Sequence, residues 1–390
     1  MAHFLAPGQL LALPLPWLLA MVLLLPLATQ SIRAGPPARL LWARQRQGRR
    51  IGFGPAAPTG VCLTLGVLLS LLSVSSLARE ASDEPFAEAI AAYGEHPRVH
   101  AVIVARDGQP VFEEVFRGPD LDTAVNIKSL AKTFMAALTG AAIHHGVIES
   151  VDQPVVSLLG DRPLGSADSR LEDVTVAHLL SMSSGLQRTS GQGYGAWVNS
   201  DDWVHHALTR PFVDTPGEDM QYSTGDYHVL GAALSESSGR NLLALSRTWI
   251  GEPLNIRIPA WDRDPQGIYF GGNNMRLSPR ALLQLGELYR NDGMANGERL
   301  LPADWVSESW TARVRSPWSG DDYGYGWFIR QAEGLSIHYG RGYGGQMLYV
   351  IPELALTVVI TADPTPPSNR GGDVDRLHRI LEQQVIPAFR

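Results

Sequence analysis

The sequence has only one cysteine, Cys62, among its 390 residues. A lone cysteine excludes an intrachain disulfide framework and a cysteine-rich metal site, and we expect neither a metal nor another cofactor. The net charge of −7, with no stripe of basic and aromatic residues beyond the N-terminal region, argues against a nucleic-acid partner. Lysine is almost absent too: "NIKSLAKTFM" holds the only two, Lys128 and Lys132, and arginine is used everywhere else. These two positions therefore need a chemical explanation.

The N-terminal region lacks charge in two long stretches, residues 4–30 and 51–77, which flank a loop with six arginines. Residues 10–29 are long enough to span a bilayer, and membrane helices tolerate the prolines that they contain. Because positive residues stay on the cytoplasmic side, an arginine-rich loop between two spans places both outer ends outside the cytoplasm. We therefore predict that residues 1–78 are membrane-directed and that residues 79–390 form a domain on the periplasmic side of the inner membrane.

A second interpretation of this region is a cleaved signal peptide. "RQRQGRR" would supply its positive start, "VCLTLGVLLSLL" its apolar centre, and the small residues Ser76 and Ala78 its cleavage site. The true translation start would then lie downstream of Met1. Both interpretations export the rest of the chain, either anchored to the membrane or released into the periplasm.

Residues 79–390 show strand patterns at both ends and helical patterns between them. Two alternating segments flank Asp107-Gly108, which is a hairpin signal, and "YGYGWFIR", "GGQMLYVIP" and "LALTVVITA" indicate strands near the C-terminus. Apolar residues at helical spacing run from Ser129 to His145, and residues 150–315 are rich in helices and loops. We predict an α/β fold with one antiparallel sheet built from both chain ends, flanked by helices, and a mostly helical subdomain inserted beside it.

Ser129 and Lys132 are three residues apart in a predicted helix, so they project from one face. A serine hydroxyl needs an adjacent base to become a nucleophile, and a neutral lysine can be that base if burial lowers its pKa. Arginine cannot deprotonate in a protein, which explains why lysine stands at position 132. A plainer interpretation is a capping serine beside a surface lysine. Lys128 is either a solvated charge or a support for the electrostatics of the site.

Two further segments favour the catalytic interpretation. "PGEDMQYSTGDYHVLG" contains Tyr222-Ser223-Thr224, and "YGRGYGGQMLYV" contains the glycine-rich turn Gly342-Tyr343-Gly344 before a strand. Together with Ser-x-x-Lys, these segments resemble, in order, the three motifs of the serine β-lactamase and penicillin-binding-protein superfamily. The resemblance covers about residues 85–390. It is strongest to the class C-like serine hydrolases, a group that holds esterases, D-amino-acid peptidases and 6-aminohexanoate-dimer hydrolases.

The resemblance implies the β-lactamase/DD-peptidase fold and an acyl-enzyme reaction. Ser129 would attack a carbonyl, Lys132 would take its proton, and Tyr222 would pass a proton to the leaving group. The backbone N–H groups of Ser129 and Tyr343 would hold the oxyanion, and residues 342–344 would occupy an edge strand that faces the site. Substrate contacts are also expected from Thr224, Gly342, Tyr343 and Gly344. Arg341 and Trp197 have two interpretations each: Arg341 holds a substrate carboxylate or is solvated, and Trp197 lines the cleft or packs in the core.

The sequence departs from the β-lactamase pattern at two positions. Thr224 stands where that pattern has asparagine, and the turn 342–344 has no lysine to hold a substrate carboxylate. We therefore expect an exported serine hydrolase that cleaves a small-molecule or short-peptide amide or ester, with little activity on β-lactams. The alternatives are a true β-lactamase or D,D-peptidase, and a non-catalytic protein that binds peptidoglycan peptides or a protein partner.

Overall fold

The computed structural model describes residues 86–162, 168–367 and 372–390. The chain divides into two units, Met1–Leu65 and Gly66–Arg390, and every described residue belongs to the second unit. Both uncharged N-terminal stretches and the predicted domain boundary after Ala78 lie outside the described residues. Within the described ranges, no helix is both long and apolar enough to cross a membrane.

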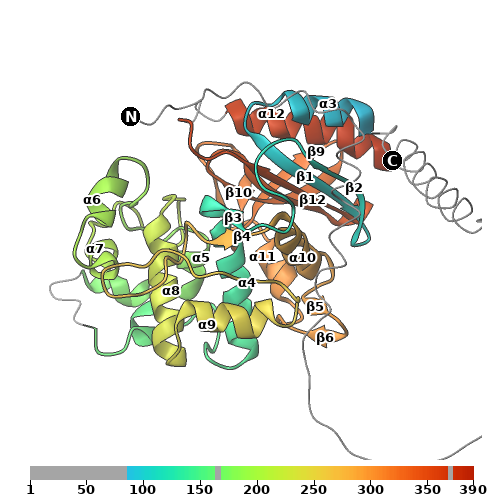
Figure 1. The fold of residues 1–390 in the computed structure, drawn as a ribbon. Coiled ribbons are helices and arrows are strands. Elements are labelled where there is room, and N and C mark those ends of the chain that lie inside the picture. Colours follow the sequence, from blue (N-terminus) through green and yellow to red (C-terminus); the bar gives the residue numbers. More distant parts are fainter. Residues whose placement is uncertain (1–85, 163–167, 368–371) are drawn as a thin grey trace, which may run out of the picture. The chain divides into compact units, whose positions relative to one another are not determined.

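An antiparallel sheet of eight strands forms the centre of the described unit (Figure 1). Its order is β2-β1-β12-β11-β10-β9-β8-β7, so strands from the two ends of the sequence meet where β1 pairs with β12. The predicted sheet from both chain ends is confirmed. The strands are β1 Val99–Arg106, β2 Gln109–Val115, β7 Val314–Arg315, β8 Asp322–Tyr323, β9 Phe328–Ala332, β10 Leu335–Gly342, β11 Gln346–Ile351 and β12 Leu356–Ala362.

Local sequence explains the central strands. All residues of β11 and β12 are buried, which fits their nearly continuous apolar runs and a sheet covered on both faces. The predicted hairpin joins β1 to β2, and its turn residues Asp107 and Gly108 have φ values of 50° and 74°. Positive φ at both central residues matches the right-handed twist of the strands, and Asp-Gly suits such a turn.

Helices cover both faces of the sheet. Helices α3 (Ala87–Glu95) and α12 (Gly372–Ile380) pack against each other near β1, and α10 (Pro279–Arg290) packs on β1, β11 and β12. Figure 1 shows α3 and α12 on one side of the sheet and α10 on the other. Helix α10 begins at a Ser278 cap, whose hydroxyl accepts from the Ala281 N–H at 3.1 Å.

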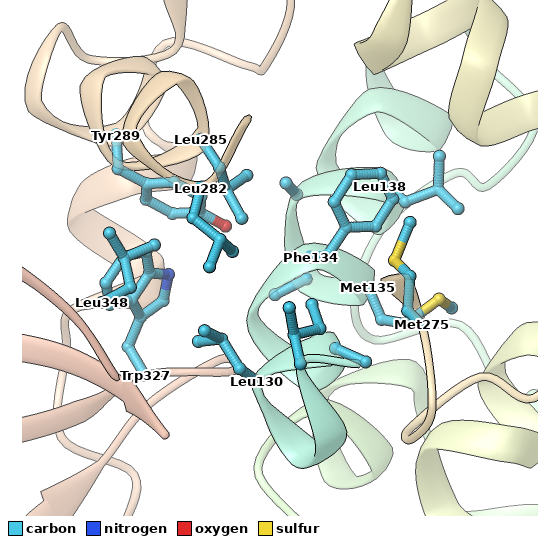
Figure 2. Packing of buried hydrophobic residues seen from close by; sticks show 14 of the residues in the cluster. Leu130, Phe134, Met135, Leu138, Met275, Leu282, Leu285, Tyr289, Trp327 and Leu348 are labelled. Carbon is cyan, nitrogen blue, oxygen red and sulfur yellow. The ribbon is translucent and has the colours of Figure 1, made fainter. Parts of the chain in front are cut away.

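The helical subdomain forms around α4 (Ala131–His144), which is buried from Ala131 to Ala142. Figure 2 shows the side chains of α4 and α10 meeting in one core with Leu348 of β11. The other helices are α5 Val176–Leu180, α6 Tyr194–Val198, α7 Trp203–Leu208, α8 Thr224–Ser238, α9 Leu242–Ser246 and α11 Trp305–Ser309. Short 3₁₀ or π segments are η2 Lys128–Leu130, η3 Val155–Leu158, η4 Ser169–Asp173, η5 Gly191–Gly193, η6 Arg247–Gly251, η7 Pro352–Leu354, η8 Leu381–Val385 and η9 Ile386–Phe389. Two strand pairs complete the unit: β3 Val125–Asn126 with β4 Arg276–Leu277, and β5 Met294–Ala295 with β6 Glu298–Arg299.

Strand β10 differs from the expectation. The segment that contains Gly342 was expected to form an edge strand, but β10 lies inside the sheet between β9 and β11. Its ladder with β9 ends at Tyr339, whereas its ladder with β11 continues to Gly342, so the end of β10 extends past β9 toward η2. A Cβ on Gly342 would collide with the Ile127 carbonyl oxygen, and one on Gly340 with the Thr133 hydroxyl. Glycine at both positions lets β10 approach the segment that carries Ser129.

Candidate active site

Ser129 lies in η2, the 3₁₀ turn that leads directly into α4. The preceding residue, Lys128, has φ +51°, which is unusual for a residue with a long side chain. Its backbone N–H donates to the Asn126 side-chain oxygen at 2.9 Å, and its Nζ donates to the Asn274 oxygen at 3.4 Å. These contacts hold the turn that presents Ser129, and they leave Lys128 directed to Asn274 on the neighbouring loop.

Lys132 is buried directly behind Ser129. Its side-chain nitrogen lies 3.2 Å from the Ser129 hydroxyl oxygen and 3.2 Å from the Thr224 hydroxyl oxygen, and it donates to the Gly272 carbonyl at 2.8 Å. Lys132 is 2% exposed, and this burial lowers the pKa of its amine, although Tyr222 and Asp226 act in the opposite direction. A neutral amine in this position can accept the proton of Ser129.

Tyr222 lies next to the Lys132 amine and lines the cavity described below. The Lys132 nitrogen lies 5.0 Å from the centre of the Tyr222 ring. Burial raises the pKa of Tyr222, but the Lys132 charge, a hydrogen bond with Ser129 and the Arg341 charge together hold it below its usual value. A tyrosine with a lowered pKa, next to both Ser129 and Lys132, can exchange a proton with either group.

Thr224 is the first residue of α8 and also contacts the lysine. Besides its contact with Lys132, its hydroxyl lies 2.9 Å from the Ser190 hydroxyl oxygen, and its backbone N–H donates to the same oxygen at 3.0 Å. Thr224 is 3% exposed, so its hydroxyl has been removed from bulk water. This residue therefore connects the lysine to Ser190.

A cavity of about 550 Å³ opens in front of Ser129 and Tyr222. Its walls come from the β7–β8 loop, the β10–β11 turn and the start of α12. Most of the predicted site residues line this cavity. The lining residues are Ser129, Tyr222, Trp318, Ser319, Arg341, Gly342, Tyr343, Gly344, Val374 and Asp375.

The structure does not bring Trp197 to this cavity. Trp197 is 0% exposed, and its ring lies 5.3 Å from that of Trp203 and 5.5 Å from that of Phe270. Its indole N–H donates to the Trp203 carbonyl at 2.9 Å, which satisfies its only polar group. The expectation of a cleft-lining tryptophan at this position is therefore corrected to a core residue.

The family assignment rests on the sequence as well as on the fold. Residues 86–382 match the family model described as Beta-lactamase. The chain belongs to the Beta-lactamase family. This confirms the resemblance inferred from the three motifs.

Relatives of this β-lactamase-family chain support a hydrolase. Esterase EstB of Burkholderia gladioli is 26% identical over 177 residues, which cover 40% of this chain and 45% of the esterase. A putative 6-aminohexanoate-dimer hydrolase from Bacillus anthracis has a TM-score of 0.60 at 19% identity, over 75% of this chain and 79% of its own. A β-lactamase/D-alanine carboxypeptidase from Yersinia pestis has a TM-score of 0.62 at 17% identity, over 80% of this chain and 99% of its own. The two solved structures show the shared fold.

This β-lactamase-family protein contains site neighbours that the sequence did not point to. Asp226 is buried on α8, and burial raises its pKa to about 7, although Ser223, Ser184 and Lys132 act in the opposite direction. Its position two residues after Thr224, in the first turn of α8, was a usable signal. Gly272, Ser190 and Trp318 gave no comparable signal, because their contacts with the site arise only in the folded chain.

Proposed function

We propose that this protein is an exported serine hydrolase that cleaves an ester or amide through an acyl-enzyme on Ser129. The observation that carries the proposal is the buried Lys132 amine, 3.2 Å from the Ser129 hydroxyl oxygen. The esterase and the putative 6-aminohexanoate-dimer hydrolase among the related proteins support an ester or amide substrate. Export follows from the arginine-rich loop and the uncharged stretches of the N-terminal region, and it is part of the proposal.

In the first half of the reaction, the Ser129 oxygen attacks the substrate carbonyl while its proton moves to Lys132. The backbone N–H groups of Ser129 and Tyr343 hold the resulting oxyanion. The intermediate then collapses, and Tyr222 passes the proton from Lys132 to a leaving group that needs one. The expelled alcohol or amine leaves Ser129 acylated.

In the second half, water attacks the acyl group. Lys132 accepts a proton from this water, the ester bond to Ser129 breaks, and the serine oxygen takes the proton back from Lys132. The products are the carboxylic acid and free Ser129. Ser129 and Lys132 therefore act in both half-reactions, and Tyr222 acts in the first.

The cavity favours a small substrate with an apolar or flat part. Trp318 and Tyr343 are 51% and 46% exposed at its wall, and such aromatic surface can pack against an acyl or leaving group. Arg341 also lines the cavity, with its guanidinium carbon 4.7 Å from the centre of the Phe328 ring. Its charge supports a second candidate function, a true β-lactamase or D,D-peptidase, because those substrates carry a carboxylate.

The decisive experiment compares two substrates on one preparation of the protein. We expect a burst followed by steady turnover of p-nitrophenyl butyrate, and little hydrolysis of nitrocefin, with Ser129→Ala as the blank. A missing charged hydrogen bond costs about 1.5–3 kcal/mol, roughly tenfold to a hundredfold, and both Thr224 and the turn 342–344 lack such a contact for a β-lactam. Nitrocefin kcat/KM well above that of the ester, abolished in Ser129→Ala, would favour the second candidate. No burst with either substrate would favour a protein that only binds.

A further inference from the structure

A chain of hydroxyl groups leads from the catalytic lysine to a second cavity. The Lys132 nitrogen lies 3.2 Å from the Thr224 oxygen, and the Thr224 oxygen lies 2.9 Å from the Ser190 oxygen. These two residues are 34 positions apart, and they meet because the start of α8 packs against the segment that precedes η5. Both distances fall in the range in which a proton can move along a hydrogen bond.

The outer end of this chain borders a second cavity. Ser190 is half-buried and lines a cavity of about 560 Å³, together with Arg188, Gln192 and Arg210. None of the residues that line this cavity also lines the one in front of Ser129. The Lys132 amine therefore contacts Ser129, which lines the substrate cavity, and is linked through Thr224 and Ser190 to the second cavity. The two cavities adjoin, because the Arg188 guanidinium carbon lies 4.9 Å from the centre of the Trp318 ring.

A substrate whose leaving group departs as an anion leaves a proton on the buried lysine. At neutral pH an ester and water give a carboxylate, an alcohol and one proton. With a p-nitrophenyl ester the leaving group departs as the phenolate, so the Ser129 proton stays on Lys132 after acylation. A protonated Lys132 cannot accept a proton from the attacking water, so this proton has to leave before the acyl-enzyme can be hydrolysed.

We propose that Thr224 and Ser190 form a proton relay that returns Lys132 to its neutral form. The Lys132 ammonium gives a proton to the Thr224 oxygen, the Thr224 hydroxyl proton moves to the Ser190 oxygen, and the Ser190 proton passes to water or buffer in the outer cavity. Each hydroxyl then carries a new proton and rotates back, and one proton has left the site. This inference rests on the proposed function.

The residue type at position 224 fits this role. A hydroxyl donates and accepts through one oxygen, so it can pass a proton on, whereas an asparagine amide accepts at its oxygen and donates from its nitrogen. Tyr222 and Asp226 face the inner end of the relay, and both favour a charged Lys132. Arg188 and Arg210 line the outer cavity. Their positive charges repel a hydronium ion, so the released proton does not accumulate there, and they attract anionic proton acceptors.

The test separates acylation from deacylation. In Ser190→Ala we expect the burst of p-nitrophenol to keep its rate, because acylation leaves the proton on Lys132, and the steady-state rate to fall about tenfold. Small proton acceptors such as imidazole should restore the steady-state rate, because they can take the proton through Tyr222, which lines the substrate cavity and lies next to Lys132. Thr224→Val should also lower the steady-state rate and be relieved by imidazole, whereas Ser190→Thr keeps the hydroxyl and should retain turnover.

A matched control is Ser200→Ala, which also removes a partly buried serine hydroxyl, one that donates to the Trp197 carbonyl at 2.7 Å. It should turn over like the wild type. A steady-state rate within twofold of wild type in Ser190→Ala would overturn the relay. So would a loss in which burst and steady state fall together and imidazole has no effect, because that pattern indicates a structural role. If the wild-type protein shows no Ser129-dependent burst, the proposed function itself fails.

Discussion

Replacing Lys132 by arginine removes the proposed base and keeps a positive charge. The lysine nitrogen has three partners at 2.8–3.2 Å in a buried site, and burial lowers its pKa. A guanidinium stays protonated at any working pH, so it cannot take the Ser129 proton. Loss of a general base costs roughly a hundredfold to ten-thousandfold in rate, and we expect kcat/KM for p-nitrophenyl butyrate to fall on the order of a thousandfold.

Two companion variants make this result interpretable. A buried arginine charge is costly, so Lys132→Arg must first be shown to fold, by circular dichroism and thermal melting. Lys132→Met has a similar length and no charge. It leaves the Gly272 carbonyl without its lysine donor, at a cost of about 1–3 kcal/mol, and it should fold and be equally inactive. Lys128 is the matched control, because it has no hydrogen bond with Ser129. Lys128→Arg should retain substantial activity. A folded Lys132→Arg protein within tenfold of wild-type kcat/KM would refute the general-base assignment.

Three further predictions test the surroundings of Lys132, the approach of β10 to Ser129 and the topology of the N-terminal region. Asp226→Asn removes a carboxylate that raises the pKa of Lys132, so the amine should deprotonate more readily. The acid limb of the kcat/KM–pH profile should therefore move to lower pH. An acid limb that stays in place or moves to higher pH would contradict this coupling. Gly342→Ala should lower both the melting temperature and kcat/KM, because its Cβ collides with the Ile127 carbonyl beside Ser129, and a wild-type profile would argue against close approach. A phosphatase fused after Ala78 should be active and one fused at Gln47 silent; the reverse pattern would invert the proposed topology.

The sequence was informative where the signal is local. The Asp107-Gly108 turn, the helix after Ser129 and the apolar strands β11 and β12 each depend on residues that are neighbours in the chain. Ser129 and Lys132 could be paired for the same reason, because residues that are three positions apart on a helix lie on the same face. The helix capped by Ser278 likewise carries its own start signal.

The parts that could not be predicted depend on distant segments. Strand β10 contains two glycines, Gly340 and Gly342, which weaken the alternating pattern, yet both are what the approach to α4 requires. The glycines before Trp197 favoured a position at the edge of the substrate cleft. In the structure, Trp203 and Phe270 from other segments pack against its ring. Ser190 and Thr224 are separated by 34 residues, and no periodic pattern connects them.

The chemistry of Lys132 is thus a property of the assembled unit. Its neutral form depends on burial, and that burial is provided by Thr224 from α8, by Gly272 from the loop before β4, and by the close approach of β10 to the start of α4. A side chain enclosed in this way can act as a base, but it also loses direct access to water. The same packing that lowers the pKa of Lys132 therefore calls for a route by which a proton left on the lysine can leave, and the hydroxyls of Thr224 and Ser190 lead from the lysine to the second cavity.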